Sequence, residues 1–150
     1  MLRPYEAVIE RRLKKIEDAE RRLTVDGARL PDIASGHEYF GLHYRNREWI
    51  FREWAPNASA VHFIGEATGW AETPSFALDR IDADGIWEIR MPDETLSHGM
   101  LYRLRIHWPD GMGDRIPVYA RRVVQDPDTL IFNAQVWHPP TPYPWTESHF

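Results

Sequence analysis

Trp70 is the residue whose type and position best suit ligand chemistry. It ends the segment Ile64-Gly65-Glu66-Ala67-Thr68-Gly69-Trp70, directly after a predicted strand, where a loop can hold an indole ring at the surface. One face of a pyranose laid on an indole contributes roughly 1–2 kcal/mol, at about 25 cal/mol per Å² of apolar surface removed from water. The pattern therefore favours a neutral polyol ligand. It also allows a second interpretation, in which Trp70 plugs the core beneath its loop.

The hydroxyl groups of such a ligand need hydrogen-bond donors and acceptors near the ring. Arg103 and Asn133 lie on predicted strands and offer a guanidinium and an amide, which act directly or through water. We therefore predict a carbohydrate-binding set made of Trp70, Arg103 and Asn133. Several stacked sugar units are required for even millimolar to micromolar affinity.

The other tryptophans are assigned by alternation along the strands. Trp87 and Trp108 fall on apolar faces and are predicted to lie in the core. For Trp49 and Trp54 the pattern does not decide between core and surface.

Catalytic chemistry has no comparable support in the sequence. No serine lies in a G-x-S-x-G elbow, and the seven histidines form neither H-E-x-x-H nor another compact ligand spacing. Gly65 and Gly69 do not form a phosphate loop. Glycosidic chemistry needs two carboxylates about 5 to 10 Å apart, and no such pair stands out. We expect no catalytic residue, no metal ion and no cofactor.

Composition excludes several other classes of protein. The chain has 150 residues and no cysteine, so it forms no disulfide and no thiolate zinc site, as suits a reducing compartment. A net charge of −5 argues against nucleic acid as a partner. The charged first residues do not resemble a signal peptide, and no apolar run approaches the roughly 18 residues of a membrane span. We expect a cytoplasmic protein with no membrane partner.

The N-terminal segment is predicted to be a helix. Residues 5–24 contain neither glycine nor proline, and one helical stripe carries Ile9, Leu13, Ile16 and Leu23. A narrow apolar stripe indicates a helix that docks on a partner surface. We assign residues 1–30 to this helix and a connector.

From residue 37 onward the period changes to two. Strands are predicted at 38–44, 49–55, 60–65, 76–80, 86–91, 101–108, 121–125 and 130–136. Many short strands separated by turns indicate a β-sandwich, which we assign to residues 31–136. Residues 137–150 hold four prolines in fourteen positions and are predicted to run extended as a linker.

Several segments together resemble the N-terminal region of 1,4-α-glucan (glycogen) branching enzymes, over nearly the whole chain. They are YEAVIERRLKKIE (5–17), ASGHEYFGLH (34–43), FREWAPNA (51–58), IGEATGW (64–70), GDRIPVYARRVVQDP (113–127) and IFNAQVW (131–137). FREWAPNA and IGEATGW alone indicate the wider family-48 carbohydrate-binding module. The RRVVQDP segment and the N-terminal helix are typical of branching enzymes.

This resemblance implies a mainly β fold, an immunoglobulin-like β-sandwich preceded by an α-helix. In that family a catalytic (β/α)₈ barrel of glycoside hydrolase family 13 follows directly, and about 250 residues would be needed for it. The resemblance thus implies a non-catalytic module, with branching activity in the full-length enzyme only. Its implied partners are α-1,4-glucan (glycogen or maltooligosaccharides) and the catalytic domain of the same parent chain.

Two departures from the family pattern bear on the sugar site. The corresponding loop of the module family reads closer to G-D-F-N-G-W than to the GEATGW of this chain. The related modules in glycogen-sensing subunits of a metabolic kinase also carry a second loop tryptophan, where this chain has Met112. Two alternatives stay open. In one, the chain is a docking domain that buttresses the barrel without binding sugar, with Tyr119, Arg121 and Arg122 at the domain interface. In the other, it is a free-standing glycogen-binding regulatory subunit.

Overall fold

The computed structural model describes residues 3–24, 31, 34–141 and 144. Contacts between residues divide the chain into two compact units, Met1–Glu38 and Tyr39–Phe150. Connector residues 25–30 and most of the proline-rich segment 137–150 lie outside the described residues. The domain boundaries drawn from the sequence therefore stay predictions.

The first unit contains the predicted helix. A 3₁₀ turn, η1 (Arg3–Tyr5), leads into α1 (Glu6–Leu23). Beyond its end, the backbone N–H and the hydroxyl of Thr24 both donate to the carbonyl of Glu20 at 2.8 Å. These bonds satisfy a carbonyl that the last turn would otherwise leave unpaired.

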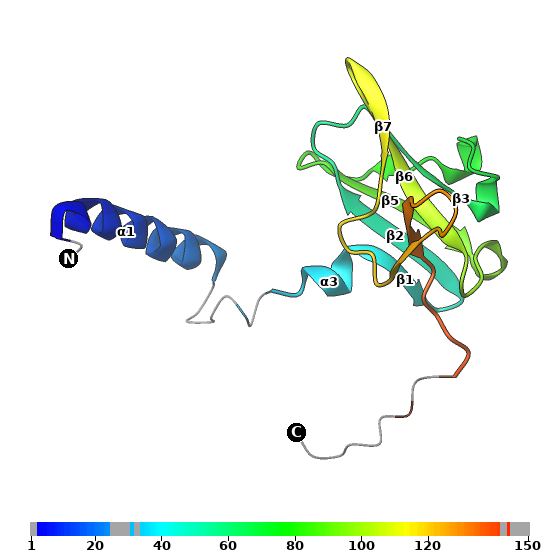
Figure 1. Ribbon diagram of the computed structural model, residues 1–150, viewed down its shortest axis with the longest axis horizontal. Coiled ribbons are helices and arrows are strands. Elements are labelled where there is room, and N and C mark those ends of the chain that lie inside the picture. The colour runs from blue at the N-terminus through cyan, green and yellow to red at the C-terminus, as the bar shows by residue number, and fades with distance from the viewer. Residues whose placement is uncertain (1–2, 25–30, 32–33, 142–143, 145–150) are drawn as a thin grey trace. The chain divides into compact units, whose positions relative to one another are not determined.

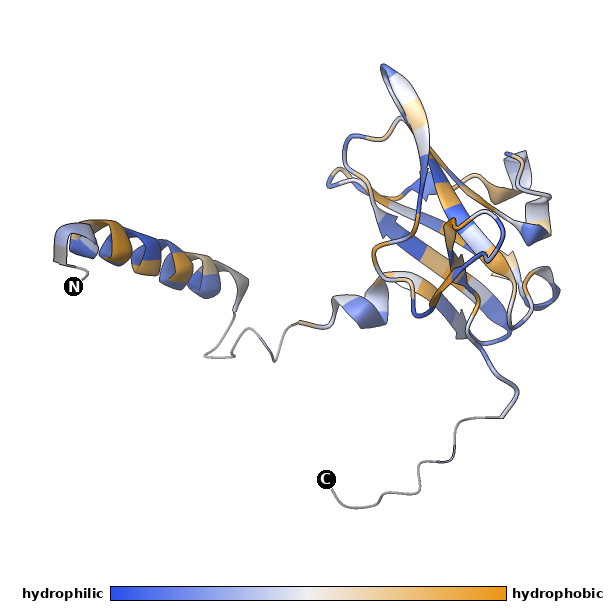
Figure 2. Ribbon diagram, in the orientation of Figure 1, coloured by the Kyte–Doolittle hydropathy of each residue, from blue (hydrophilic) through white to orange (hydrophobic). Residues whose placement is uncertain are grey.

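The apolar stripe of α1 lies along one side of the helix (Figure 2). Ile9, Leu13 and Ile16 are exposed within it, whereas the side chain of Leu23 lies outside the described part. No helix among the described residues has the length and apolarity needed to cross a membrane.

The second unit is a sandwich of two antiparallel sheets (Figure 1). The first sheet has the order β1 (Gly41–Arg45), β2 (Glu48–Trp54), β5 (Ile86–Pro92) and β4 (Asp79–Arg80). The second has the order β3 (Ala60–Gly65), β6 (Leu101–Trp108), β9 (Phe132–Gln135) and β8 (Val123–Gln125), and β7 (Gly111–Arg115) also pairs with β6. The short helices are α3 (Gly36–Tyr39), η2 (Glu66–Thr68), η3 (Pro74–Phe76) and η4 (Asp93–Thr95). The mainly β prediction is confirmed.

Alternation along the strands builds the core between the sheets. The predicted inward faces of β5 and β6 are buried at Trp87, Ile89, Met91, Tyr102, Leu104 and Ile106. At the centre, the rings of Phe63 and Tyr102 stack with centroids 4.8 Å apart, and Phe51 meets both edge-on. These side chains remove the largest apolar surfaces from water and so hold the two sheets together.

Trp108 departs from the prediction, because it is 43% exposed rather than part of the core. It lies at the last position of β6, where the β6–β7 hairpin extends beyond the body of the sandwich (Figure 1). No facing sheet remains there to bury the ring. The indole instead packs over Gly111 and Gly113, where an added Cβ would come within 3.3 and 3.2 Å of it.

Several strand boundaries also differ from the predicted ones. Residues 36–39 form α3, so the strand predicted at 38–44 begins only at Gly41. Pro74 starts a 3₁₀ turn, which reduces the strand predicted at 76–80 to Asp79–Arg80. Strand β7 was not predicted, because the glycines of its sequence were interpreted as a turn.

Candidate functional site

The loop after β3 holds Trp70 at the surface. The N–H of Trp70 donates to the carbonyl of Gly65 at 2.8 Å, and the Thr68 hydroxyl accepts from the Gly65 N–H and donates to its carbonyl, both at 3.1 Å. Gly69 and Trp70 have φ of +59° and +63°, so two left-handed residues turn the chain outward. The indole is 38% exposed, and the interpretation of Trp70 as a core plug is therefore wrong.

The three residues predicted to bind carbohydrate come together in one depression of about 340 Å³. Trp70 arrives from the loop after β3, Arg103 from β6 and Asn133 from β9. Arg103 lies opposite Ile64 in the β3–β6 pairing, so it stands beside the start of the Trp70 loop. The remaining lining residues are Glu66, Leu101, Asp126, Thr129 and Ile131. We call this depression the Trp70 pocket.

Two polar groups of the Trp70 pocket are set in place by the sheet. Asn133 is only 6% exposed, and β9 fixes its position against Val124 of β8. The Nε of Arg103 is buried and has no hydrogen-bond partner among the described residues. A buried donor without a partner costs free energy, which an ordered water can recover.

The loop between β8 and β9 forms the other rim of the pocket. The Asp126 carboxylate accepts from the N–H of Asp128 and from the N–H and hydroxyl of Thr129, at 3.0, 2.7 and 2.9 Å. The bonds from Thr129 hold the pKa of Asp126 below its usual range. Because Asp126 is engaged in its own turn, Glu66 is the carboxylate of the pocket that faces solvent. The pocket therefore suits binding of a polyhydroxy ligand and has no matched acid and base.

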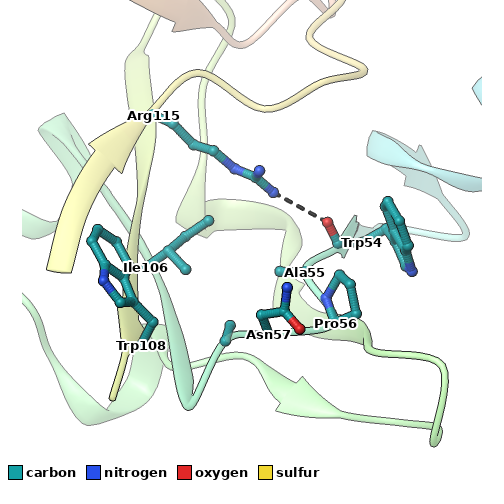
Figure 3. Close-up of a pocket in the computed structure, with 8 residues that line it drawn as sticks. Trp54, Ala55, Pro56, Asn57, Ile106, Trp108 and Arg115 are labelled. Carbon is teal, nitrogen blue, oxygen red and sulfur yellow. Dashed lines mark hydrogen bonds between the residues drawn. The ribbon is translucent and has the colours of Figure 1, made fainter. Parts of the chain in front are cut away.

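A second depression, of about 370 Å³, lies between the β2–β3 turn and the β6–β7 hairpin (Figure 3). Its lining residues are Trp54, Ala55, Pro56, Asn57, Ala58, Ile106, Trp108 and Arg115. We call it the Trp108 pocket. The sequence did not predict it, because alternation placed Trp108 inside and left Trp54 undecided.

The four tryptophans of the strands now have definite places. Trp49 and Trp87 are buried, and their indole N–H groups donate to the carbonyls of Asp93 and Ala55 at 3.1 and 3.0 Å. The burial of Trp87 confirms its prediction. Trp54 is 56% exposed and donates to the carbonyl of Asp84 at 2.9 Å.

Beside the Trp108 pocket, Glu53 points into the sandwich and is 2% exposed. Arg115 donates to its Oε1 at 3.0 Å and to the carbonyl of Trp54 at 3.2 Å (Figure 3), and the N–H of Val118 donates to its Oε2 at 3.3 Å. Burial raises the pKa of Glu53 above its ordinary value, against the opposing effect of Arg115. The pair is thus part of the structure of this end of the sandwich.

The predicted domain-interface residues lie in the segment between β7 and β8. Tyr119 stacks on Phe40, with centroids 5.4 Å apart, and borders an apolar depression of about 560 Å³. Arg121 lies 3.0 Å from Nδ1 of His43, and the guanidinium of Arg122 lies 4.3 Å from the centre of the Trp137 ring. All three side chains are exposed.

The interaction with Arg121 defines the charge state of the buried His43. An arginine only donates hydrogen bonds, so Nδ1 of His43 accepts, and Nε2 donates to the carbonyl of Phe40 at 2.9 Å. Burial lowers the pKa of His43 below 6.5, and Arg121 acts in the same direction. This imidazole is therefore neutral and structural.

Curated relatives match almost all of this chain. The 1,4-alpha-glucan-branching enzyme of Rhizophagus irregularis is 32% identical over 151 residues, covering 96% of this chain and 22% of that enzyme. The enzyme of the same name from Dictyostelium discoideum is 30% identical over 148 residues, covering 95% and 22%. The predicted resemblance to branching enzymes is confirmed. The chain spans about a fifth of the length of these relatives.

Solved structures share the fold at low sequence identity. Pullulanase type I from Bacillus subtilis, complexed with maltose, has a TM-score of 0.54 at 19% identity over 88% of this chain and 16% of that chain. The pullulanase from Anoxybacillus sp. LM18-11, complexed with maltotetraose, has a TM-score of 0.52 at 20% identity over 74% and 16%. At these identities the likeness concerns the fold alone.

The family described as carbohydrate-binding module 48 (isoamylase N-terminal domain) matches residues 39–127. This range includes the first eight strands in their entirety, the Trp70 loop and Arg103, and it ends shortly before Asn133. The match covers more than half of the chain and agrees with the immunoglobulin-like sandwich described above. The chain therefore belongs to the carbohydrate-binding module 48 family.

Proposed function

We propose that this chain binds α-1,4-glucan through the Trp70 pocket and positions it for the catalytic domain of a branching enzyme. The observation that carries the proposal is the convergence of Trp70, Arg103 and Asn133 from three separate segments on one depression. The names of the curated relatives support the parent enzyme, and the maltose and maltotetraose complexes of the pullulanases support the ligand class.

Each of the three side chains has a distinct part in this binding. The indole of Trp70 offers an apolar face to the CH groups of one glucose unit. Arg103 donates to hydroxyl oxygens, and the amide of Asn133 both donates and accepts. Glu66 and Thr129 stand at the rim, where they accept from hydroxyl groups of the same or the next unit.

No bond is made or broken at this pocket in our proposal. Glycosidic cleavage requires one carboxyl group as acid and a second as base or nucleophile. Of the two carboxylates that line the pocket, Asp126 is held ionised by its three hydrogen bonds, and Glu66 stands in water. Cleavage and transfer of the glucan belong to the proposed parent enzyme.

The experiment is an NMR titration of the chain with maltoheptaose. Loss of one stacked ring corresponds to roughly 1–2 kcal/mol, so Trp70→Ala should weaken binding by about 5- to 30-fold. Trp108→Ala is the matched control, since it removes another exposed indole, and it should leave the affinity within about twofold. Shifts that gather around Trp108, or unchanged affinity in Trp70→Ala, would refute the assignment of the site.

A docking role is the second candidate, and the apolar depression beside Tyr119 favours it. Phe40, Trp54, Val118 and Tyr119 all contribute to its lining, a gathering of apolar surface that suits a protein partner. In this alternative the segment with Arg121 and Arg122 contacts the catalytic domain and no sugar binds. The same titration decides, because absence of any shift near Trp70 at millimolar maltoheptaose leaves only docking.

A further inference from the structure

Three potential metal ligands meet on the outer face of the second sheet, away from the core. His62 lies on β3, His107 on β6, and Glu72 in the segment that follows Trp70. In the β3–β6 pairing, His62 faces Arg105 and Ala60 faces His107, so the two histidines are diagonal neighbours. Their sequence separations of 10 and 35 residues match no metal-ligand signature, so spacing along the chain does not predict this cluster.

The carboxylate of Glu72 stands between the two imidazoles. Its Oε1 lies 2.9 Å from Nε2 of His107, and its Oε2 lies 3.7 Å from Nε2 of His62. One ligand atom of each residue falls within 4.8 Å of the others; the two histidines are partly buried, whereas Glu72 is exposed. Tetrahedral zinc with bonds of about 2.0–2.1 Å spaces its ligands by about 3.3–3.4 Å. The two distances from Glu72 lie on either side of that spacing, and the two imidazoles approach each other within 4.8 Å.

We propose that His62, Glu72 and His107 form a three-ligand site for a divalent transition-metal ion, with zinc as the first choice. Two imidazoles and one carboxylate match the preference of zinc for nitrogen and oxygen donors, and a fourth position stays open for water. This inference stands independently of glucan binding.

The charges around the cluster are compatible with a cation. The Nε of Arg105 lies 3.8 Å from Glu72 and opposes metal binding. However, Arg105 makes a bidentate pair with Asp114 at 2.7 and 3.0 Å, which offsets its charge.

A metal ion at this site would also restrict the motion of the loop that carries Trp70. Glu72 follows Trp70 by two residues, and both histidines belong to strands of the sheet beneath. Coordination would join the end of this loop to β3 and β6 at once. The expected consequence is slower amide exchange in residues 66–72 when zinc is bound.

The test is isothermal titration of the untagged, chelator-treated chain with zinc chloride, together with thermal unfolding. We expect one zinc ion per chain and a melting temperature that rises with zinc concentration, since the ion binds the folded state. Substituting Ala at either histidine, or Gln at Glu72, should weaken zinc at least tenfold. His37→Ala, which removes an exposed histidine from α3, is the matched control and should bind zinc as the unaltered chain does.

Imidazole NMR of the unaltered chain keeps the test independent of whether the variants fold. Zinc should move the ring resonances of His62 and His107 together and leave those of His37 in place. Cobalt(II) should give the visible absorption bands of a four-coordinate site. The proposal is overturned if zinc up to 1 mM (about the weakest useful affinity) leaves these rings unmoved, or if the substituted chains bind as tightly as the original.

Discussion

The Trp70 pocket and the Trp108 pocket share three kinds of chemical group, although only the Trp70 pocket is also lined by carboxylates. Each has an exposed indole, an arginine and an asparagine, and their volumes are about 340 and 370 Å³. They differ in how far these groups are already occupied. The Nε is without a partner in both arginines. Arg115 of the Trp108 pocket, however, donates through Nη2 to Glu53 and to the Trp54 carbonyl, whereas Arg103 makes no hydrogen bond in the described part of the chain.

The asparagine and the indole of the Trp70 pocket also differ from those of the Trp108 pocket in how the fold holds them. Asn133 is buried on a strand, whereas Asn57 is exposed in a turn. The Trp70 ring projects from a loop fixed by its own hydrogen bonds, whereas the Trp108 ring lies over two glycines of its hairpin. Donors that are both fixed and unoccupied distinguish a binding site from a surface of similar composition.

The largest expected effect is a difference in protein stability between substitutions of the two arginines. Arg115→Ala leaves Glu53 buried without its cation and should lower the free energy of unfolding by about 3 kcal/mol, the lower end for a broken buried pair. Arg103→Ala should lower it by less than about 1 kcal/mol but weaken maltoheptaose binding. Urea denaturation of both variants measures the difference. Equal losses of stability would mean that the two arginines have the same structural role.

A smaller effect is expected on the affinity for maltoheptaose when the two asparagines are substituted. Asn133→Ala removes a hydrogen bond to a neutral sugar, worth about 0.5–1.5 kcal/mol, and should weaken maltoheptaose binding by roughly 2- to 12-fold. Asn57→Ala, the matched control on the Trp108 pocket, should change the affinity by less than about twofold. Calorimetric titration measures both, and a reversed order would transfer the glucan to the Trp108 pocket.

The smallest effect concerns the carboxylates near the two pockets, whose pKa values are shifted in opposite directions. The raised pKa of Glu53 means that its contribution to stability is present below pH 4.5 and is lost as pH rises through its folded-state pKa. The lowered pKa of Asp126 means that its contribution is present above pH 3.8 and is lost as pH falls through its folded-state pKa.

Carboxyl ¹³C titration by NMR should therefore show Glu53 titrating above 4.5 and Asp126 below 3.8. The groups that act on Glu53 are Arg115 and the N–H groups of Val118 and Trp54, and Tyr102 lies close enough for Glu53 to affect its pKa. Glu53→Gln should remove the part of the pH dependence of stability that is assigned to Glu53. The same midpoint for both carboxyls would show that burial at one and hydrogen bonding at the other have no net effect.

Much of the sandwich was predictable, because period-two alternation reports the side of a strand. It placed Trp87 and Tyr102 in the core, where the facing sheet covers them. It failed for Trp108, since alternation assumes that both sheets continue to the end of the strand. Alternation also missed β7, because glycines weaken the sequence pattern of a strand. In β7 the absence of side chains at Gly111 and Gly113 leaves room for the ring of Trp108.

By itself, the sequence determined the N-terminal helix, most of the strands, the sandwich, the Trp70 loop and the family, since these depend on local periodicity and on contiguous motifs. Only the tertiary structure decided which polar groups are occupied and which distant residues meet. Arg103 and Arg115 look alike along the chain, and His62, Glu72 and His107 are far apart in it. Strand pairing sets such encounters, because a register joins residues whose separation in sequence carries no information about their distance in space.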